Sequence, residues 1–304
     1  MTVLEKLPQG AKVAAIRLRS LGDCVLTTPA LALLKRARPD LEIGVAVEPS
    51  YREVFAGNPA VASILSSDWQ SVRKWRPILC VNLHGGTRSQ WMTALSGARW
   101  RAGFAHHTTT LAYNIKIPRA QRILGVHRRV HTAEHLASAF FALGVPLGQV
   151  PRALLFTESA AETERHAVLH PFASSAEKTW PAERFIELAR YLKLWNIKPI
   201  FLSGPTDDAT PFREHTVLAG SLSQVKSVLS NASLFVGNDS GPAHMAAAFG
   251  VPSLVLFSTS DPTVWEPWKT ESEVIVARDG LQTVSVSRVI AALERLLTFT
   301  EAHA

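Results

Sequence analysis

Short apolar segments alternate with helix-forming segments in both halves of the chain, and this alternation constrains the fold more than any other feature. In the first half, Val13–Leu18 and Glu42–Val47 have the pattern of buried strands. Between them, Thr27-Thr28-Pro29 predicts the start of a helix, with a threonine cap and a proline in its first turn. A strand, a helix and a strand in this order form a βαβ unit, so the strands are parallel. Further elements of this half are expected at Ile78–Leu83, Arg88–Leu95 and Thr132–Leu143.

The second half repeats the alternation after Gly144–Pro151, a segment rich in glycine and proline. Its predicted strands are Ala167–His170, Pro199–Leu202, Leu234–Gly237 and Ser253–Phe257. Its predicted helices are Pro181–Leu194, Leu222–Ser230, Gly241–Phe249 and Val286–Leu297. We therefore expect an α/β protein with two doubly wound sheets, one in residues 1–148 and one in residues 149–304. The last helix packs either on its own domain or back on the first.

The net charge of +7 is distributed unevenly along the chain. Residues 1–150 hold 19 Lys and Arg against 8 Asp and Glu, whereas residues 151–304 hold 13 against 17. Between Asp68 and Glu134 there is no acidic residue, and this interval holds 11 Lys and Arg. Two interpretations remain open: the first domain meets an anionic partner, or it presents a solvated basic face without one.

Composition and missing motifs exclude several classes of protein. No apolar run approaches the roughly 18 residues of a membrane span, and the N-terminus lacks the apolar region of a signal peptide. Two cysteines, Cys24 and Cys80, are too few for a disulfide framework or a zinc site, so we expect a reduced, cytoplasmic protein. The motifs HExxH, CxxC and GxSxG are absent, which argues against metal and acyl-transfer sites. The first strand-to-helix turn lacks GxGxxG, which argues against a nicotinamide or flavin enzyme.

The strongest local signal is the segment Val236–His244, where an apolar strand runs into a polar turn and a helix begins at once. Free N–H groups and the helix dipole at such a start favour phosphate, and Ser240 adds a hydroxyl. The alternative is ordinary helix capping by Asp239 or Ser240. His244, taken alone, fits a packed histidine of the first turn better than a catalyst.

Two further turns follow predicted strands. The loop after His170 carries a single lysine, Lys178, which either pairs with a phosphate as a point charge or is simply exposed. The turn after the first strand carries Asp23, which is either a general base in the crevice or a helix cap. Cys24 beside it is expected to be a packed residue and not a nucleophile.

Together these segments resemble glycosyltransferase family 9, the ADP-heptose:lipopolysaccharide heptosyltransferases. The resemblance is carried by Ile16–Leu31, Asn82–Ser89, Lys178–Phe185 and, most specifically, the segment from Val236 to Trp268. It implies a GT-B fold, in which two Rossmann-like domains face a central cleft. It also implies inversion at the anomeric carbon of the sugar, without a metal or other cofactor. The stretch between Ser66 and Ile78 is short for this family, which leaves the acceptor less defined than the donor.

The family's roles transfer to individual positions. Asp23 matches the general base, and Lys178 also matches a catalytic group because it holds the leaving diphosphate. The implied donor site consists of Ser174, Lys178, Asp239, Ser240, Gly241 and His244. Asp207 or Asp208 lies where the family contacts the ribose. For an anionic acceptor from the lipopolysaccharide inner core, the candidates are Arg73, Arg76, Arg88 and Arg119, because arginine forks match carboxylates. The same basic surface suits a peripheral contact with anionic lipid headgroups of the inner membrane.

Three other interpretations compete with this one. A nucleotide-sugar epimerase shares the GT-B architecture but does not explain the basic interval. A family member could use another sugar, because sequence does not show which hydroxyl configuration is recognised. A nucleic-acid-binding protein would fit the pI of about 9.7. It is disfavoured because no recognition-helix, RRM or KH pattern occurs and the second half is acidic, so we expect no nucleic-acid partner.

Overall fold

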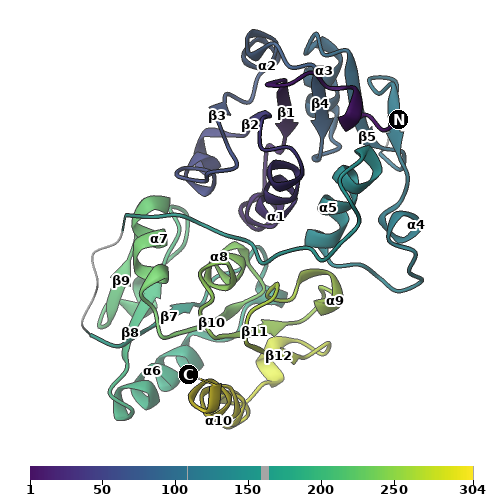
Figure 1. Ribbon diagram of the computed structural model, residues 1–304. Helices are drawn as coiled ribbons and strands as arrows, with labels where there is room; N and C mark the ends of the chain where they lie inside the picture. The colour runs from purple at the N-terminus through teal and green to yellow at the C-terminus, as the bar shows by residue number, and fades with distance from the viewer. Residues whose placement is uncertain (108, 159–163, 304) are drawn as a thin grey trace. The chain divides into compact units, whose positions relative to one another are not determined.

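The computed structural model describes residues 1–107, 109–158 and 164–303, and it consists of two compact units, Met1–Phe156 and Thr157–Ala304 (Figure 1). Each unit is described by itself. Both are built as the alternation predicts: every strand pairing within each sheet is parallel, and helices connect the strands. The expected α/β class with two doubly wound sheets is therefore confirmed.

The first unit contains a six-stranded sheet in the order β3-β2-β1-β4-β5-β6. Its strands are β1 (Lys12–Ile16), β2 (Glu42–Ala46), β3 (Ser63–Leu65), β4 (Leu79–Asn82), β5 (Trp100–Phe104) and β6 (Ile115–Ile117). Its helices are α1 (Leu21–Ala37), α2 (Trp69–Trp75), α3 (Thr87–Leu95), α4 (Ala120–Leu124) and α5 (Thr132–Leu143), with short 3-10 turns at Leu4–Lys6 and Pro49–Val54. The order reverses at β1, which lies between β2 and β4, so the carboxyl ends of β1 and β4 form the crevice where such folds bind ligands.

Helix α1 begins at Leu21, six residues before the start that we expected at Thr27. A capping box between Ser20 and Asp23 starts the helix earlier, and Pro29 lies inside it. A proline in a helix interior leaves the carbonyl four residues earlier without its usual donor. Here that carbonyl belongs to Val25, and it accepts instead from the Thr28 hydroxyl (2.8 Å). The threonine before the proline therefore compensates the helix rather than capping it.

The division between the units falls after Phe156 and not after residue 148. The reason is visible at Leu154, whose backbone N–H donates to Thr28 Oγ1 of α1 (3.2 Å). The segment that follows the glycine- and proline-rich stretch thus belongs to the first unit as far as Phe156.

The second unit contains a six-stranded sheet in the order β12-β11-β10-β7-β8-β9. Its strands are β7 (His166–His170), β8 (Lys198–Leu202), β9 (Thr216–Leu218), β10 (Leu234–Asn238), β11 (Ser253–Phe257) and β12 (Ser272–Val276). Its helices are α6 (Ala182–Leu194), α7 (Leu222–Ser230), α8 (Gly241–Phe249), α9 (Pro262–Trp265) and α10 (Val286–His303), with 3-10 turns at Ala176–Lys178, Thr210–Phe212 and Leu281–Thr283. The order reverses between β7 and β10, which places the crevice at their carboxyl ends.

The core of the second unit explains why its strands read as continuous apolar runs. Helices cover both faces of a parallel sheet, so β10 and β11 are buried along their whole length. Trp180 is fully buried against Phe185, with ring centroids 4.8 Å apart, and its indole N–H donates to the Val284 carbonyl (2.8 Å). Removal of a tryptophan side chain from such a site costs about 3–5 kcal/mol. The terminal helix α10 contributes Val289 and Leu293 to this same core and packs against α6.

Candidate functional site

The first half of the candidate site lies at the switch point of the second unit, where β7 and β10 run side by side. Asn238 ends β10 and is fully buried. Its side-chain oxygen accepts from the backbone N–H of Trp180 (3.1 Å), and its side-chain nitrogen donates to the Pro171 carbonyl (2.9 Å). One amide therefore fixes both ends of the loop that carries Lys178. Gly237 permits this close approach, because a Cβ there would lie 3.0 Å from the His170 carbonyl oxygen.

Lys178 and Asp239 are brought together from two different loops. Lys178 Nζ donates to Ser260 Oγ (2.6 Å) and lies 3.6 Å from Asp239 Oδ2. Its side chain is 27% exposed and that of Asp239 is 13% exposed, so a ligand can still reach the ammonium group. These two residues are about 60 positions apart in the sequence. They lie at the same carboxyl edge of the sheet because they follow the neighbouring parallel strands β7 and β10.

The start of α8 brings the Gly241 N–H and the positive end of the helix dipole to this edge. Ser240 is the N-cap residue, but its side chain makes no capping hydrogen bond. Its hydroxyl pairs instead with His170 Nδ1 (3.0 Å). Burial lowers the pKa of His170 to about 4, so the imidazole is neutral at pH 7. Of the first three residues of α8, Pro242 has no N–H, and the Ala243 N–H donates to the Ser240 carbonyl (3.2 Å). The Gly241 N–H receives no acceptor from the Ser240 side chain, and together with the helix dipole it favours an anion.

The remaining donor-site predictions are placed as follows. Gly241 begins α8 and is half-buried, while Ser174 is exposed on the loop after β7. His244 is buried in the first turn, 6.2 Å from the ring of Trp265, which fits a packed histidine. After β8, Asp207 Oδ2 accepts from the Gly204 N–H (2.7 Å) and closes the turn, whereas Asp208 is exposed.

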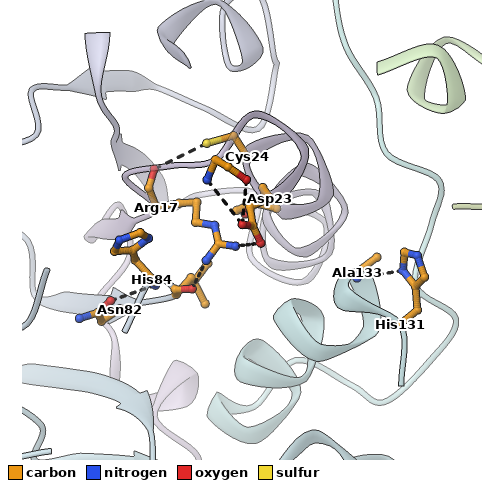
Figure 2. A network of polar contacts seen from close by, with 10 residues as sticks. Arg17, Asp23, Cys24, Asn82, His84, His131 and Ala133 are labelled. Carbon is orange, nitrogen blue, oxygen red and sulfur yellow. Dashed lines mark hydrogen bonds and ion pairs between the residues drawn. The ribbon is translucent and has the colours of Figure 1, made fainter. Parts of the chain in front are cut away.

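The second half of the candidate site lies at the carboxyl edge of the first unit's sheet. Asp23 is the third residue of α1 and contacts the guanidinium of Arg17 through Oδ1 (Figure 2). Its other oxygen accepts from the Ser20 hydroxyl (3.1 Å). The same guanidinium donates to the Leu83 carbonyl after β4 (2.6 Å), so Arg17 joins the ends of two neighbouring strands. The Asp23 side chain is 21% exposed and can accept a proton from a ligand.

The structure supports the expectation that Cys24 is a packed residue. It is fully buried, and its pKa is raised to about 12. Burial is the main cause, Arg17 acts in the opposite direction, and the neighbouring Asp23 that we invoked from sequence contributes less. A thiol with such a pKa is not a nucleophile at pH 7.

A cluster of four histidines beside Asp23 escaped the sequence analysis. We call His84, His106, His107 and His135 the histidine cluster. His84 follows β4, His106 and His107 follow β5, and His135 lies on α5. The rings of His106 and His135 are 5.4 Å apart, and His107 Nδ1 pairs with the Tyr113 hydroxyl (3.0 Å). One signal in the sequence could have indicated this cluster, namely the adjacent pair His106-His107. It was missed because the strand that precedes it, β5, was not predicted.

All members of the histidine cluster are neutral at pH 7. Burial is the main cause that lowers the pKa of His107 and of His135 to about 4, and neighbouring imidazoles and Arg17 contribute to the same shift. The pKa of His84 is lowered by burial and by Arg17 and Arg19, and that of His106 by burial and by Arg119. The cluster therefore presents uncharged ring nitrogens to a ligand near Asp23.

The four predicted acceptor arginines do not form one surface. Arg119 is exposed after β6, at the same sheet edge as Asp23, and its charge acts on His106. Arg88 also lies at this edge, but its guanidinium is engaged by Glu48 (3.1 Å) and by the Ser67 carbonyl (2.5 Å). Arg73 and Arg76 lie at the end of α2, just before β4 begins. In a parallel sheet this is the amino edge, opposite to the edge that carries Asp23.

Neither a metal cluster nor a membrane helix is found in the described part of the chain. Among residues 1–107, 109–158 and 164–303, no group of three His, Cys, Asp or Glu side chains is arranged to hold a metal ion. Over the same ranges, no helix combines the length and the apolar character that crossing a bilayer requires.

Comparison with known proteins gives a consistent result. The family model "Glycosyltransferase family 9 (heptosyltransferase)" matches residues 69–289. The lipopolysaccharide heptosyltransferase 3 of Escherichia coli is 24% identical, over 91% of this chain and 96% of the relative. Among solved structures, the ADP-heptose lipopolysaccharide heptosyltransferase II of E. coli superposes with a TM-score of 0.81 at 19% identity, covering 95% of this chain and 99% of the other. The E. coli heptosyltransferase WaaC with ADP-2-deoxy-2-fluoro heptose superposes with a TM-score of 0.77 at 20% identity, covering 93% and 99%.

Proposed function

Because the chain belongs to glycosyltransferase family 9 and is an enzyme of the heptosyltransferase kind with a GT-B fold, we propose that it transfers a heptose from ADP-heptose to an anionic acceptor of the lipopolysaccharide inner core. The observation that carries this proposal is the pairing of Lys178 with Asp239 and Ser260 beside the uncapped start of α8. This arrangement offers a cation, the Gly241 N–H and the positive end of the helix dipole to a leaving diphosphate.

We assign Lys178 and the Gly241 N–H at the start of α8 to the diphosphate, where they stabilise the negative charge that develops as ADP leaves. Asp239 has a different role, because a carboxylate repels phosphate. It holds the ammonium of Lys178 in position and accepts hydrogen bonds from donor hydroxyls. Ser240 donates its hydroxyl to the phosphate when His170 Nδ1 carries the proton and donates to Ser240 Oγ. Ser174 on the exposed loop provides a second hydroxyl.

We assign Asp23 as the general base. An acceptor hydroxyl oxygen bonds to the anomeric carbon while the bond from that carbon to the ADP oxygen breaks on the opposite face, which inverts the configuration. The acceptor's proton passes to Asp23 as the new bond forms. Arg17 is a positioning residue, since it holds one carboxylate oxygen and anchors it to the carbonyl of Leu83. The second oxygen, which faces Ser20, receives the proton.

The set of arginines that we propose for the acceptor differs from the set that the sequence predicted. We assign Arg119 and Arg19 to the acceptor's carboxylates and phosphates, because both are exposed at the carboxyl edge beside the histidine cluster. Arg88 supports this edge through Glu48 and Ser67. The position of Arg73 and Arg76 at the opposite edge argues against a direct role for them. Exposed arginines near the site also favour peripheral contact with anionic lipid, at about 1 kcal/mol for each basic residue near the surface.

The test is a transfer assay with a panel of nucleotide sugars and purified inner-core acceptors, read by mass spectrometry of the acceptor. We expect a mass increase of one heptose from ADP-heptose and none from UDP-N-acetylglucosamine. Epimerised nucleotide sugar without any acceptor product would contradict the proposal. Thermal stabilisation by ADP but not by an oligonucleotide is the matching binding test.

A further inference from the structure

An apolar groove of about 220 Å³ lies in the first unit beside α1, and we call it the α1 groove. Three segments line it, namely residues 28–36 of α1, the turn 58–60, and residues 152–156 at the end of the unit. Its apolar lining consists of Ala32, Pro59, Ala60, Leu154 and Phe156. No residue of the candidate site described above lines it, so the groove is a separate feature of the molecule.

Hydrogen bonds and close packing hold the three segments of the α1 groove together. The Leu154 N–H donates to Thr28 Oγ1 (3.2 Å), which fixes the last segment on α1. In the turn, the Ala60 N–H donates to Oδ1 of the buried Asn58 (2.9 Å). Gly57, just before the turn, has a φ of +73°, and a Cβ there would lie 3.1 Å from the Cβ of Phe156. The groove is therefore preformed, concave and mostly apolar, as small-molecule sites usually are.

The charges at the α1 groove have one sign. Lys35, Arg36 and Arg152 belong to its lining, and no acidic side chain does so among the described residues. The ammonium of Lys35 is engaged by the carbonyls of Pro39 (2.7 Å) and Leu41 (2.8 Å). Arg36 and Arg152 are exposed, and neither forms an ion pair with another described residue. Two guanidinium groups without a carboxylate partner can bind a carboxylate or a phosphate, which gives the ligand an anionic head.

The volume of the α1 groove limits the apolar part of the ligand. At about 30 Å³ for each non-hydrogen atom, as in liquid water, 220 Å³ holds roughly seven atoms. A nucleotide is too large for this space, and an inorganic phosphate would leave the apolar lining without a partner. A chain of about six to eight carbons fills it, and the aliphatic side chains of Ala32, Ala60 and Leu154 suit such a chain.

We propose that the α1 groove binds an amphiphilic anion, with an aliphatic chain in the groove and a carboxylate or phosphate head at Arg36 and Arg152. The bound chain would contact both α1 and Leu154, so it would hold the segment 152–156 on α1 in addition to the hydrogen bond at Thr28. The proposal does not rest on the proposed function, because no residue assigned to the donor or the acceptor takes part in it.

The test titrates the full-length protein with octanoate and with octyl phosphate, and ligand-detected NMR gives the Kd of each. We expect both to bind, and octylammonium, which has the same chain and the opposite charge, to bind at least about tenfold more weakly. Arg152→Glu should raise the Kd of octanoate about three- to tenfold, because an exposed cation is replaced by a repelling charge. Arg213→Glu, at an exposed arginine of the second unit, is the matched control and should leave this Kd unchanged.

A second variant tests the place of the chain. Ala32→Trp fills the α1 groove, so we expect it to raise the Kd of octanoate more than tenfold. Ala142→Trp, at an exposed position of α5 in the same unit, is its control and should bind octanoate as wild type does. If octanoate does not bind wild type, if octylammonium binds equally well, or if Ala32→Trp and Arg152→Glu both leave the Kd unchanged, the proposal is overturned. Arg152 is exposed, so its variant reports even if Ala32→Trp unfolds.

Discussion

The Arg17 guanidinium contacts Asp23 Oδ1 (Figure 2), and it donates to the Leu83 carbonyl (2.6 Å). It thereby ties the start of α1 to the end of β4, the two segments that flank the switch point of the first unit. A carboxylate held in this way keeps one oxygen for structure and presents the other to a ligand. The consequences for catalysis can be tested at both residues.

Asp23→Asn preserves the shape of the side chain but removes its capacity to accept a proton. We expect kcat to fall by about 10²–10⁴, with the Kd of ADP unchanged. Steady-state kinetics and calorimetry measure the two quantities. Asp40→Asn, at a carboxylate that pairs with Arg38 on the surface, is the control and should keep its kcat. Normal turnover of Asp23→Asn would reduce Asp23 to a helix cap.

Lys178→Ala removes the proposed diphosphate cation. A charge-assisted hydrogen bond contributes about 1.5–3 kcal/mol, so we expect the Kd of ADP to rise roughly 10- to 100-fold while the Kd of adenosine changes little. Lys193→Ala, at an exposed lysine of α6, is the matched control. Equal losses for ADP and adenosine would point to a structural role for Lys178.

The proposed diphosphate site compensates charge with Lys178 and the start of α8, so it needs no divalent cation for donor binding. We therefore expect the initial rate to be the same with and without EDTA. Inactivation by EDTA, with recovery on addition of Mg²⁺ or Mn²⁺, would contradict this description of the diphosphate site.

Acceptor binding should depend on Arg119 and not on α2. We expect Arg119→Glu to raise the KM of the acceptor about three- to tenfold at low salt, and less at high salt, because exposed charges are screened. The double variant Arg73→Glu with Arg76→Glu lies at the other sheet edge and serves as control. If the control raised the KM of the acceptor more than Arg119→Glu did, the acceptor would bind near α2 and this assignment would be wrong.

The buried histidines predict how stability depends on pH. The pKa values of His107, His135 and His170 are lowered to about 4 in the folded protein, against about 6.5 in the unfolded chain. Between these values the unfolded chain binds more protons, so the free energy of unfolding falls as the pH drops from 6.5 towards 4. Urea unfolding at pH 7.5 and pH 5 measures this loss. His135→Gln should show a smaller difference between the two pH values, and an unchanged difference would contradict the prediction for that residue.

Elements with strong local signals could be predicted from the sequence. Leu222–Ser230, Gly241–Phe249 and Ser253–Phe257 are observed with the bounds that the apolar pattern predicted. The edge strands β3, β6 and β9 were not predicted, because three residues are too few to show a period. The start of α1 was misplaced, because Pro29 resembles a first-turn proline and its compensation by Thr28 depends on a side-chain hydrogen bond.

The candidate site was predictable only where one segment carries the signal. The turn after β10 combines a strand end, a polar turn and a helix start, so Asp239, Ser240 and Gly241 could be singled out. The histidine cluster could not, because its members come from different elements. The pairing of β4 with β5 brings His84 and His106 to one edge, and His135 of α5 joins them by stacking on Phe104 (ring centroids 4.1 Å apart). The acceptor arginines were wrongly predicted to lie together because they are close in the sequence. The fold places Arg73 and Arg76 at one edge of the sheet and Arg88 and Arg119 at the other.

The hydrogen bond from the Leu154 N–H to Thr28 Oγ1 bears on how the enzyme can be dissected. The segment from 149 to 156 is bound to α1 and is part of the first unit, and it is not a free linker between the units. A fragment that ends at residue 148 would lack this segment. The middle of α1, the helix whose first turn carries Asp23, would then be exposed. Recombinant halves, split reporters or chimaeras with an exchanged second unit should therefore place their junction after Phe156. A junction at 148 would confuse loss of a partner half with damage to α1.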